Sequence, residues 1–390
     1  MNSPKQILPI IVISQFCCTS LWFASNGVMG DLVSNFKLNQ NALGHLTSAV
    51  QFGFISGTLI FALLTIADRF SPSKVFFSSA LLGAVFNGTM IGNFNSFESL
   101  LLLRFLTGFF LAGIYPVGMK IAADYYDKGL GKSLGFLVGA LVLGTALPHL
   151  LKDLLTAISW RYVLLMTSGL ASFGGLAMAL FVPDGPYRKL SKSLDFSAIF
   201  RVFKNPKFRA AAFGYFGHMW ELYAFWAFVP IMLKYYAQLH PINSLNVPLL
   251  SFSIIGIGGL SCVIGGYISQ YIGPKNTAFY ALFLSCICCL VSPFIFSVGS
   301  QILFVGFLMI WGMAVITDSP MFSTLVAQNA EIEIKGTALT IVNCIGFAIT
   351  IVSIQLLNSV QFILGYSTMY LLLAIGPILG LIALKNNKTN

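Results

Sequence analysis

The feature that most constrains this chain is a series of long, uninterrupted apolar stretches that fill most of its length. Each is long enough for a tilted helix to cross the hydrocarbon core of a bilayer, which takes about 20 mostly apolar residues. Twelve such stretches lie at roughly 7–30, 43–66, 75–93, 98–122, 131–151, 159–182, 210–235, 248–271, 277–298, 301–325, 336–359 and 364–384. Only 9% of the 390 residues are charged, whereas a soluble domain carries about 25%. The chain therefore cannot form a water-soluble fold.

The continuous apolar character of the stretches favours helices over strands. A membrane barrel would instead show segments of about ten residues that alternate in polarity. Backbone exposed to lipid must satisfy its hydrogen bonds within a helix or a closed barrel. We predict an all-α integral membrane protein with twelve transmembrane helices, and short loops that leave no room for a large soluble catalytic domain.

Basic residues are unequally divided between alternate loops. When the loops are assigned to the two sides in turn, one side holds seventeen Lys and Arg residues, and Arg104 lies within a stretch. The other side holds only Lys37, Lys152, Arg161 and Lys234. The positive-inside rule then places both termini in the cytoplasm. We expect a multi-pass protein of the cytoplasmic membrane, whose net charge of +10 reflects orientation rather than a nucleic-acid partner.

One long connection divides the stretches six and six. It is basic, contains Pro183, Pro186 and Pro206, and spans roughly residues 183–209. A connection of this composition is typical of a linker at the cytoplasmic membrane surface. We therefore predict three parts, an N-terminal six-helix half, a cytoplasmic linker and a C-terminal six-helix half, at residues 1–182, 183–209 and 210–390.

Prolines at equivalent places indicate that the two halves arose by duplication. Pro72 and Pro274 follow the second and eighth stretches, 202 residues apart. Pro116 and Pro320 lie in the fourth and tenth stretches, 204 residues apart. Because both pairs fall at matching points of a six-plus-six layout, we predict two six-helix pseudo-repeats in parallel orientation.

Common catalytic motifs are absent from the sequence, namely the Gly-rich phosphate loop, His-Glu-x-x-His and Gly-x-Ser-x-Gly. Cys286 and Cys289 form a C-x-x-C pair, but no His or carboxylate stands nearby in the sequence. All seven cysteines lie within apolar stretches, so we expect them to pack rather than to bind metal or form disulfides. We expect no enzyme activity, no metal and no cofactor.

Three short patterns resemble the Major Facilitator Superfamily of secondary transporters. The turn after the second stretch, at residues 67–74, keeps the acidic and basic positions of the family signature. Arg104 is followed four residues later by Gly108, and Trp160 with Arg161 opens the sixth stretch. The resemblance covers the whole chain, and it implies two halves that rock around a site near the membrane midplane to give alternating access.

Two further regions resemble a bacterial subgroup of transporters whose substrates are unassigned. They are Gly217–Tyr223 in the seventh stretch, and Asp318–Pro320 followed by Gly336–Thr340. The fifth stretch contains glycines and Pro148 in an order similar to the antiporter pattern of the family, but it lacks the Gly-Pro pair of that pattern. Symport and antiport therefore both stay open.

Glu221 is the most unusual residue of the sequence because about eleven residues of its stretch precede it. An ionisable group near the bilayer centre costs about 2.5–3.5 kcal/mol on insertion scales. His218 lies one turn earlier on the same helical face, so the two side chains could share a proton. Asp318, close before Pro320, either binds a coupling proton or caps a broken helix end. Structural hydrogen bonding is the alternative for Glu221 and His218.

Arg104 lies about six residues inside the fourth stretch, on the face that also carries Tyr115. Its guanidinium cannot lose its charge, so it needs an anion or carbonyl partner. We expect it either to bind an anionic group of the substrate or to make a structural contact between helices.

Polar residues form strips on several predicted helices. Gln15, Thr19, Trp22 and Asn26 recur at the spacing of one helical face in the first stretch, and other strips include Gln51 and Asn343. Such strips avoid lipid, so they either line the transport path or pack helices together. The complete set predicted for substrate binding and coupling is Trp22, Asn26, Gln51, Arg104, Tyr115, His218, Glu221, Trp226, Asp318 and Asn343.

Asp68, Arg69 and Lys74 of the turn after the second stretch are predicted to form a cytoplasmic gate. There a carboxylate can accept hydrogen bonds from a helix N-terminus in one state and release them in another. We predict a monomeric, proton-coupled transporter of a small molecule, such as an organic anion, embedded in the lipid bilayer. The alternatives are an exporter of amphipathic compounds by proton antiport, a non-transporting membrane sensor and a membrane-embedded enzyme.

Overall fold

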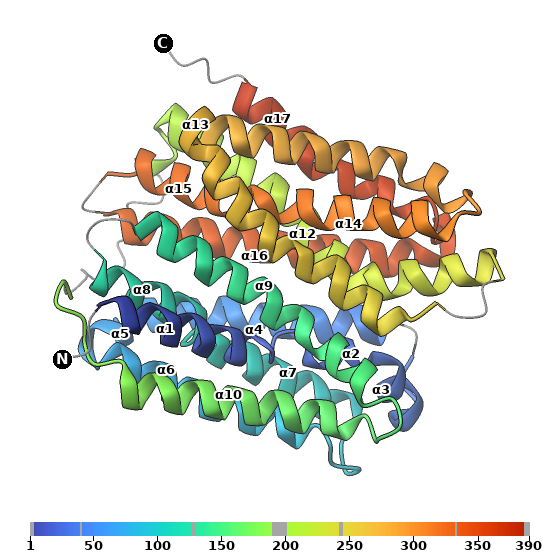
Figure 1. The fold of residues 1–390 in the computed structure, drawn as a ribbon, viewed down its shortest axis with the longest axis horizontal. Helices are drawn as coiled ribbons and strands as arrows, with labels where there is room; N and C mark the ends of the chain where they lie inside the picture. Colours follow the sequence, from blue (N-terminus) through green and yellow to red (C-terminus); the bar gives the residue numbers. More distant parts are fainter. Residues whose placement is uncertain are drawn as a thin grey trace. The chain divides into compact units, whose positions relative to one another are not determined.

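The computed structural model describes residues 4–39, 41–126, 130–188, 201–241, 245–331 and 334–385. These residues are nearly all helical and include no strand, which confirms the predicted all-α fold (Figure 1). The chain divides into two compact units, Met1–Leu194 and Asp195–Asn390. The division falls inside the predicted linker 183–209.

Unit 1 contains the first ten helices. They are α1 (Pro4–Thr19), α2 (Ala24–Gly27), α3 (Met29–Phe36), α4 (Ala42–Leu63), α5 (Ile66–Arg69), α6 (Pro72–Thr89), α7 (Phe97–Leu111), α8 (Tyr115–Tyr125), α9 (Leu130–Leu154) and α10 (Arg161–Phe181). The first predicted stretch is thus not one continuous helix, because turns replace the helix between Thr19 and Ala24. The expectation of one regular polar face from Gln15 to Asn26 was therefore wrong.

Unit 2 contains longer helices. They are α12 (Pro206–Leu239), α13 (Val247–Phe296), α14 (Gln301–Thr317), α15 (Ser319–Asn329), α16 (Lys335–Leu364), the 3₁₀-helix η2 (Met369–Ala374) and α17 (Ile375–Lys385). At 1.5 Å per residue the 50 residues of α13 would extend about 75 Å, far beyond the hydrocarbon core of about 30 Å. The backbone breaks at Gly273, whose φ of 82° suits only glycine, and Pro274 follows. This break separates the eighth and ninth predicted stretches.

Seven helical segments of the described chain are long and apolar enough to cross a membrane. They are Ala42–Leu63, Phe97–Tyr125, Gly135–Leu154, Arg161–Phe181, Val247–Phe296, Gln301–Asn329 and Lys335–Leu364, with shorter apolar helices at Ile7–Thr19 and Met369–Lys385. Each of the twelve predicted stretches coincides with helix. The arrangement is consistent with twelve crossings.

The helix breaks explain the repeated prolines. The fourth stretch divides into α7 and α8, and the tenth divides into α14 and α15. Pro116 and Pro320 each occupy the second residue of the helix that follows the break. Proline is tolerated there because the first turn of a helix has no intrahelical partner for its N–H groups.

A close backbone contact also repeats in the two units. A Cβ atom added to Gly108 of α7 would lie 2.0 Å from the carbonyl oxygen of Val50 in α4. A Cβ atom added to Gly312 of α14 would lie 2.1 Å from the carbonyl oxygen of Ile254 in α13. The two glycines and their two partners are both separated by 204 positions. This shared packing supports the predicted duplication and explains the glycine that follows Arg104.

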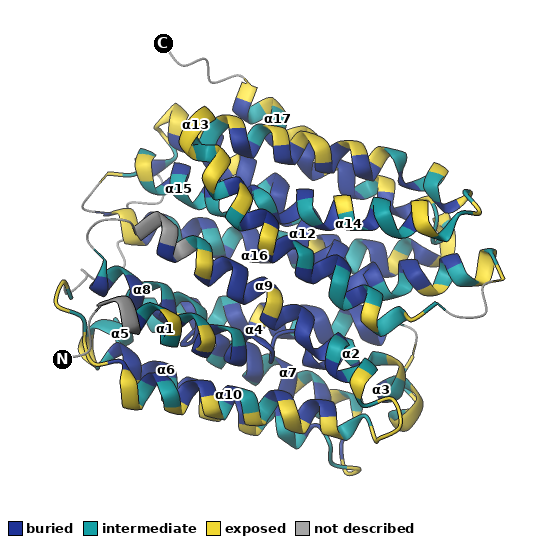
Figure 2. Cartoon of the chain, in the orientation of Figure 1, coloured by how far each residue is buried: buried dark blue, intermediate teal, exposed yellow. Residues whose placement is uncertain are grey.

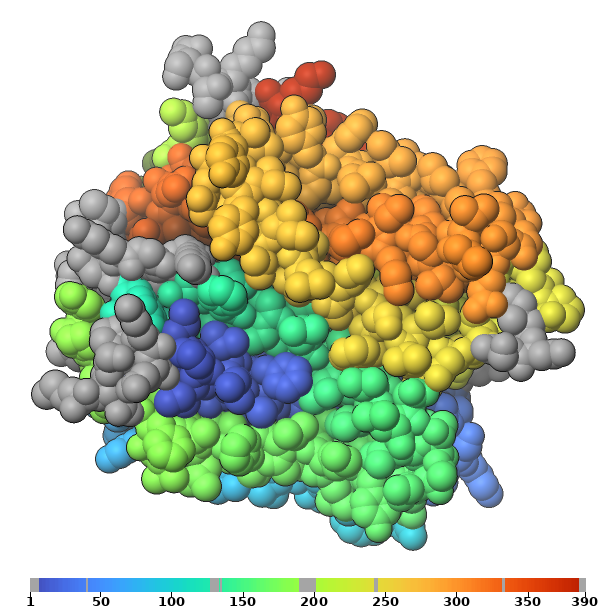
Figure 3. Space-filling view, in the orientation of Figure 1, coloured from blue at the N-terminus to red at the C-terminus, as the bar shows by residue number. Residues whose placement is uncertain are grey.

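Large apolar residues are exposed on both units, and Figure 2 shows exposed residues in yellow along α10 and α13. Phe173 and Leu180 of α10 are 60% and 66% exposed, and Tyr271 and Phe294 of α13 are 88% and 72% exposed. Figure 3 shows α13 and α14 side by side at the surface of unit 2. A surface of this kind suits contact with lipid, whereas water would penalise it.

Candidate functional site

Glu221 lies at the centre of a buried cluster in unit 2. Its side chain is 1% exposed, and its Oε1 accepts hydrogen bonds from Ser285 Oγ (2.5 Å), Trp311 Nε1 (2.5 Å) and Cys289 Sγ (3.2 Å). Its Oε2 has no hydrogen-bond partner among the described residues. The donors favour the ionised carboxylate, whereas burial favours the protonated acid. Opposing demands of this kind suit a group that gains and loses a proton.

His218 and Asp318 form a second buried pair in the same unit. The His218 Nδ1 atom lies 2.8 Å from Asp318 Oδ1, and both side chains are 1% exposed. The contact is short but is not aligned as a hydrogen bond, and His218 Nε2 has no partner in the described part of the chain. Asp318 occupies the position before α15, yet its side chain makes no capping hydrogen bond. The structure thus brings Asp318 against His218, which lies one helical turn before Glu221 on α12.

A glycine permits this approach of α12 to α15. A Cβ atom added to Gly214, one turn before His218, would lie 2.3 Å from the ring of Phe322. That ring in turn lies 6.1 Å from the imidazole of His218, measured between centroids. The short separation of the two helices therefore depends on the missing side chain at Gly214.

Aromatic pairs pack along α12, and one of them includes a donor to Glu221. Trp311 packs against Phe225 with 4.7 Å between ring centroids, and Tyr223 lies 5.2 Å from both Trp226 and Phe347. Trp226 is completely buried. Asn343 is half-buried on α16. The indole that donates to Glu221 is thus held in place by a packed aromatic neighbour.

In unit 1 two of the predicted polar strips meet each other. Trp22 Nε1 donates to Gln51 Oε1 (3.3 Å), and Asn26 Nδ2 donates to Thr47 Oγ1 (3.0 Å). Trp22 also packs against Phe54 with 4.7 Å between ring centroids. These contacts join the broken first helix to α4.

Arg104 of α7 is fully buried and binds the broken part of the first helix. Its Nη1 donates to the carbonyl oxygen of Leu21 (3.0 Å), and its Nη2 donates to that of Trp22. A helix break leaves carbonyl groups without their usual partners, and the guanidinium satisfies two of them. Of the two alternatives raised by the sequence, the structure shows the carbonyl partner. Tyr115, the other predicted residue of this face, is half-buried at the start of α8.

Unit 1 also holds buried amides with unused hydrogen-bonding atoms. Gln15 and Gln51 are both 0% exposed. Both amide atoms of Gln15 and the Nε2 of Gln51 have no partner among the described residues. A Cβ atom added to Gly118 would lie 2.3 Å from Gln15 Oε1, so this glycine leaves room for the amide. These atoms are available to a polar ligand.

His149 is a buried polar residue that was not among those predicted from the sequence. This residue of α9 is 3% exposed, and its Nε2 has no partner within the described ranges. Thr145, one turn earlier, is fully buried, and its Oγ1 likewise lacks a partner there. A His inside an apolar stretch, directly after Pro148, was the signal that could have identified it.

The three residues predicted to form the gate do not lie in one cluster. Asp68 Oδ1 lies 3.0 Å from Lys120 Nζ, which is also 3.7 Å from Asp124 Oδ1. Arg69, by contrast, is exposed and donates from Nε to Thr65 Oγ1 (3.1 Å). Lys74 is exposed on α6. Lys120 and Asp124 were missed because they lie at the end of the fourth stretch, about 50 residues after Asp68.

Residues that follow α10 contact the turn of unit 1 that contains Asp68. Arg188 donates to the carbonyl oxygens of Asp68 and Phe70, both at 2.8 Å, and pairs with Asp184 at 2.5 Å. Ser71 Oγ donates to Asp184 Oδ1 (2.6 Å). The first residues of the predicted linker thus hold the turn that contains Asp68.

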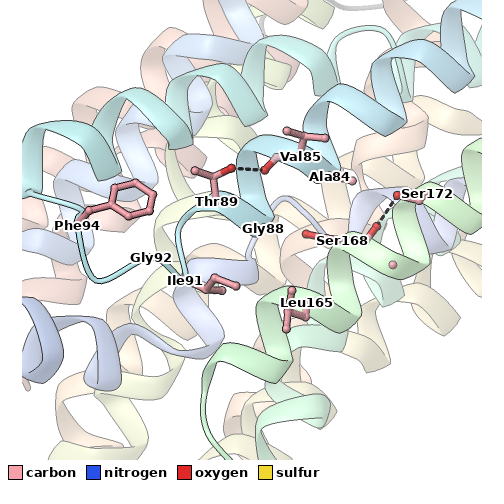
Figure 4. Close-up of a pocket in the computed structure, with 11 residues that line it drawn as sticks. Ala84, Val85, Gly88, Thr89, Ile91, Gly92, Phe94, Leu165, Ser168 and Ser172 are labelled. Atoms are coloured by element: carbon pink, nitrogen blue, oxygen red, sulfur yellow. Dashed lines mark hydrogen bonds between the residues drawn. The ribbon is translucent and has the colours of Figure 1, made fainter.

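A shallow groove of about 490 Å³ lies between α6 and α10 (Figure 4). Val85 and Leu165, which line it, are 54% and 43% exposed. None of the predicted site residues lines this groove. Its open, apolar character is that of a lipid-facing surface rather than of a transport site.

The chain matches the model of a known protein family. The model of the Major Facilitator Superfamily matches residues 11–354. The chain belongs to this superfamily. The family predicted from Asp68, Arg104 and Trp160 is therefore confirmed, and it is a family of multi-pass membrane transporters rather than of enzymes.

The proteins similar in sequence include an efflux pump and an uncharacterized protein. The efflux pump FUBT of Fusarium oxysporum is 27% identical over 195 residues, which is 47% of this chain and 32% of the pump. An uncharacterized protein of Campylobacter jejuni is 23% identical over 291 residues, which is 70% of this chain and 84% of that protein. The chain thus matches only about a third of the length of the fungal pump.

Solved structures share the fold over nearly the whole chain. A mutant form of the nucleoside transporter NupG has a TM-score of 0.74 at 16% identity, and the match covers 98% of this chain and 99% of that one. A bacterial homologue of the human lysosomal transporter Spinster has a TM-score of 0.72 at 13% identity, with 99% and 96% covered. At these identities the likeness concerns the fold alone.

Proposed function

We propose that this protein is a proton-coupled secondary transporter of a small metabolite and that Glu221 carries the coupling proton. The observation that carries the proposal is the asymmetric environment of the carboxyl group. Three donors bind Oε1, while Oε2 is buried without a partner in the described residues. Ser285, Cys289 and Trp311 come from α13 and α14, so the protonation of Glu221 bears directly on the packing of three helices.

The buried groups favour an uncharged, hydrogen-bonding substrate. Arg104 is the one buried Lys or Arg in the described part of the chain, and its two terminal nitrogens are bound to carbonyl oxygens. The organic-anion hypothesis therefore loses the residue on which it mainly rested. Gln15 and Gln51 instead offer amide donors and an acceptor, which match hydroxyl, amide or nucleobase groups.

Orientation and gating complete the proposal. On the positive-inside assignment, the Asp68–Lys120 contact lies at the cytoplasmic end of unit 1, where it opens and closes during alternating access. The protein works as a monomer in a bacterial inner membrane with both termini in the cytoplasm.

Paired transport assays test the coupling. Purified protein in liposomes that contain a pH-sensitive dye is offered a panel of nucleosides, sugars and carboxylates. For a compound that is transported, Glu221→Gln should abolish accumulation driven by a pH gradient, because the amide cannot ionise, while exchange of labelled for unlabelled compound persists. Glu331→Gln is the matched control, since Glu331 is 55% exposed and only 3.4 Å from Arg201 in a surface pair, which contributes little. Normal gradient-driven accumulation by Glu221→Gln would reduce this residue to a packing role.

A second candidate is export by proton antiport, which the similarity to a fungal efflux pump favours. The same dye distinguishes the two. Symport moves protons and substrate in one direction, whereas antiport moves them in opposite directions. Adding substrate outside the liposomes should therefore acidify the lumen for symport and make it more alkaline for antiport.

A further inference from the structure

We propose that His218 and Asp318 form a second proton-binding site, which exchanges its proton with Glu221 inside unit 2. The inference rests on the proposed role of Glu221, and it adds an acceptor for the proton that Glu221 releases. It is carried by two buried atoms without partners among the described residues, His218 Nε2 and Glu221 Oε2. These atoms belong to side chains three residues apart on α12.

The spacing suits transfer through one water molecule. Side chains at i and i+3 of a helix have Cβ atoms about 5–6 Å apart. A water molecule with a hydrogen bond of about 2.8 Å to each neighbour joins polar atoms about 5–6 Å apart, so the transfer requires His218 Nε2 and Glu221 Oε2 to come within that distance of each other. Asp318 Oδ1 in turn lies 2.8 Å from His218 Nδ1.

The proton balance of the transfer is simple. Neutral His218 with its proton on Nδ1, 2.8 Å from Asp318 Oδ1, leaves Nε2 as the acceptor. The O–H bond of protonated Glu221 breaks, and the bridging water passes a proton to Nε2, where an N–H bond forms. Glu221 becomes a carboxylate, and the imidazolium of His218 is balanced by the Asp318 carboxylate. No other reactant is required.

The groups around the pair support this assignment. From α13, the Cys262 thiol lies near Asp318 and the Cys289 thiol donates to Glu221, and Tyr215 lies on the His218 side of α12. Helices α16 and α17 approach α12 through Gly346 and Gly376, which carry no titratable group. No Lys or Arg is buried in the described part of unit 2, so the carboxylates are the counter-charges available to an imidazolium there.

The position of Asp318 also favours a charged carboxylate. It directly precedes α15, and the N-terminus of a helix stabilises a negative charge. A Cβ atom added to Gly265 would lie 2.5 Å from Thr317 Cγ2, so close packing of α13 on α14 fixes the residue before Asp318. Asp318 is thus held where it can stabilise a charged His218.

Histidine NMR tests the inference without a known substrate. The chain contains four His residues, and ring labelling of purified protein in detergent allows His218 to be assigned by its loss in His218→Gln. When the pH is varied from about 5 to 8, the wild-type signal should show both the neutral and the protonated imidazole, because the proposal makes His218 a proton acceptor. In Asp318→Asn the ratio of protonated to neutral His218 at a given pH should fall about tenfold or more, because the counter-charge is lost. Glu221→Gln should change the course of the titration, since coupled groups titrate together.

Two results would overturn the proposed proton exchange between Glu221 and His218. One is a His218 that keeps a single protonation form across this pH range in the wild type. The other is a titration that is the same in Glu221→Gln as in the wild type. His240, whose Nε2 is 2.9 Å from the carbonyl oxygen of Phe296, is the internal control, and its unchanged signal shows that the variants fold. If Glu221→Gln instead transports normally in liposomes, the proposed function fails, whatever the NMR titration shows.

Discussion

Replacing Arg104 should destabilise unit 1 strongly. Arg104→Met keeps most of the apolar length of the side chain but removes both donors to the carbonyl oxygens of Leu21 and Trp22. A hydrogen bond that involves a charged group contributes about 1.5–3 kcal/mol. The loss of two such bonds should therefore cost about 3–6 kcal/mol, with little screening because Arg104 is 0% exposed.

Thermal unfolding in detergent, followed by circular dichroism, measures this cost. For a unit of this size each kcal/mol shifts the melting temperature by about 2–4 °C, so a fall on the order of 10 °C or more is expected. Arg104→Lys should show a smaller fall because an ammonium group can still reach one carbonyl. Arg161→Met is the control, since Arg161 donates to Ile91 O at 3.1 Å from a more exposed position.

One result would refute the structural role. If Arg104→Met melts within about 2 °C of the wild type, the contacts with the broken helix do not stabilise the fold. If Arg104→Met melts normally but no longer binds a transported compound, Arg104 contacts the substrate, as the organic-anion hypothesis requires.

Two more substitutions probe the gate and the repeated helix contact. Asp68→Asn removes the charge that pairs with Lys120 at 3.0 Å, so it should slow turnover severalfold while the dissociation constant changes little; an affinity that collapses at a normal exchange rate would contradict the gate. Gly312→Ala places a methyl group 2.1 Å from the carbonyl oxygen of Ile254 and should cost about 1–3 kcal/mol by overpacking, measured by thermal unfolding. Gly306→Ala on the same helix, where nothing lies within 4 Å, should be neutral or stabilising by up to about 1 kcal/mol; equal effects at both glycines would show that the contact is unimportant.

The sequence predicted the fold well because its signal is local. Each apolar stretch reports its own helix, and Pro116 and Pro320 mark equivalent breaks without any knowledge of packing. The break between Thr19 and Ala24 was not predictable in this way. It contains no proline and no glycine, and its carbonyl groups are satisfied by Arg104, a residue more than 80 positions away.

The site was only partly predictable for the same reason. Glu221 and His218 share one helix, so periodicity placed them together. Asp318 was recognised as unusual, but its contact with His218 spans 100 positions and depends on close helix packing at Gly214. Ser285 and Cys289, the donors to Glu221, resemble ordinary small residues of an apolar helix and carry no signal of their own.

The two units use buried charge in different ways, and this difference makes a last prediction. In unit 1 the charge of Arg104 meets backbone carbonyls, and neither partner titrates near neutral pH. In unit 2 Asp318 meets His218, which can change its protonation there. The stabilisation by Arg104 should therefore be independent of pH. The difference in melting temperature between the wild type and Arg104→Met should stay constant from about pH 6 to 8, whereas transport varies over that range. A difference that grows or shrinks with pH would show that Arg104 interacts with a titrating group and not only with the broken helix.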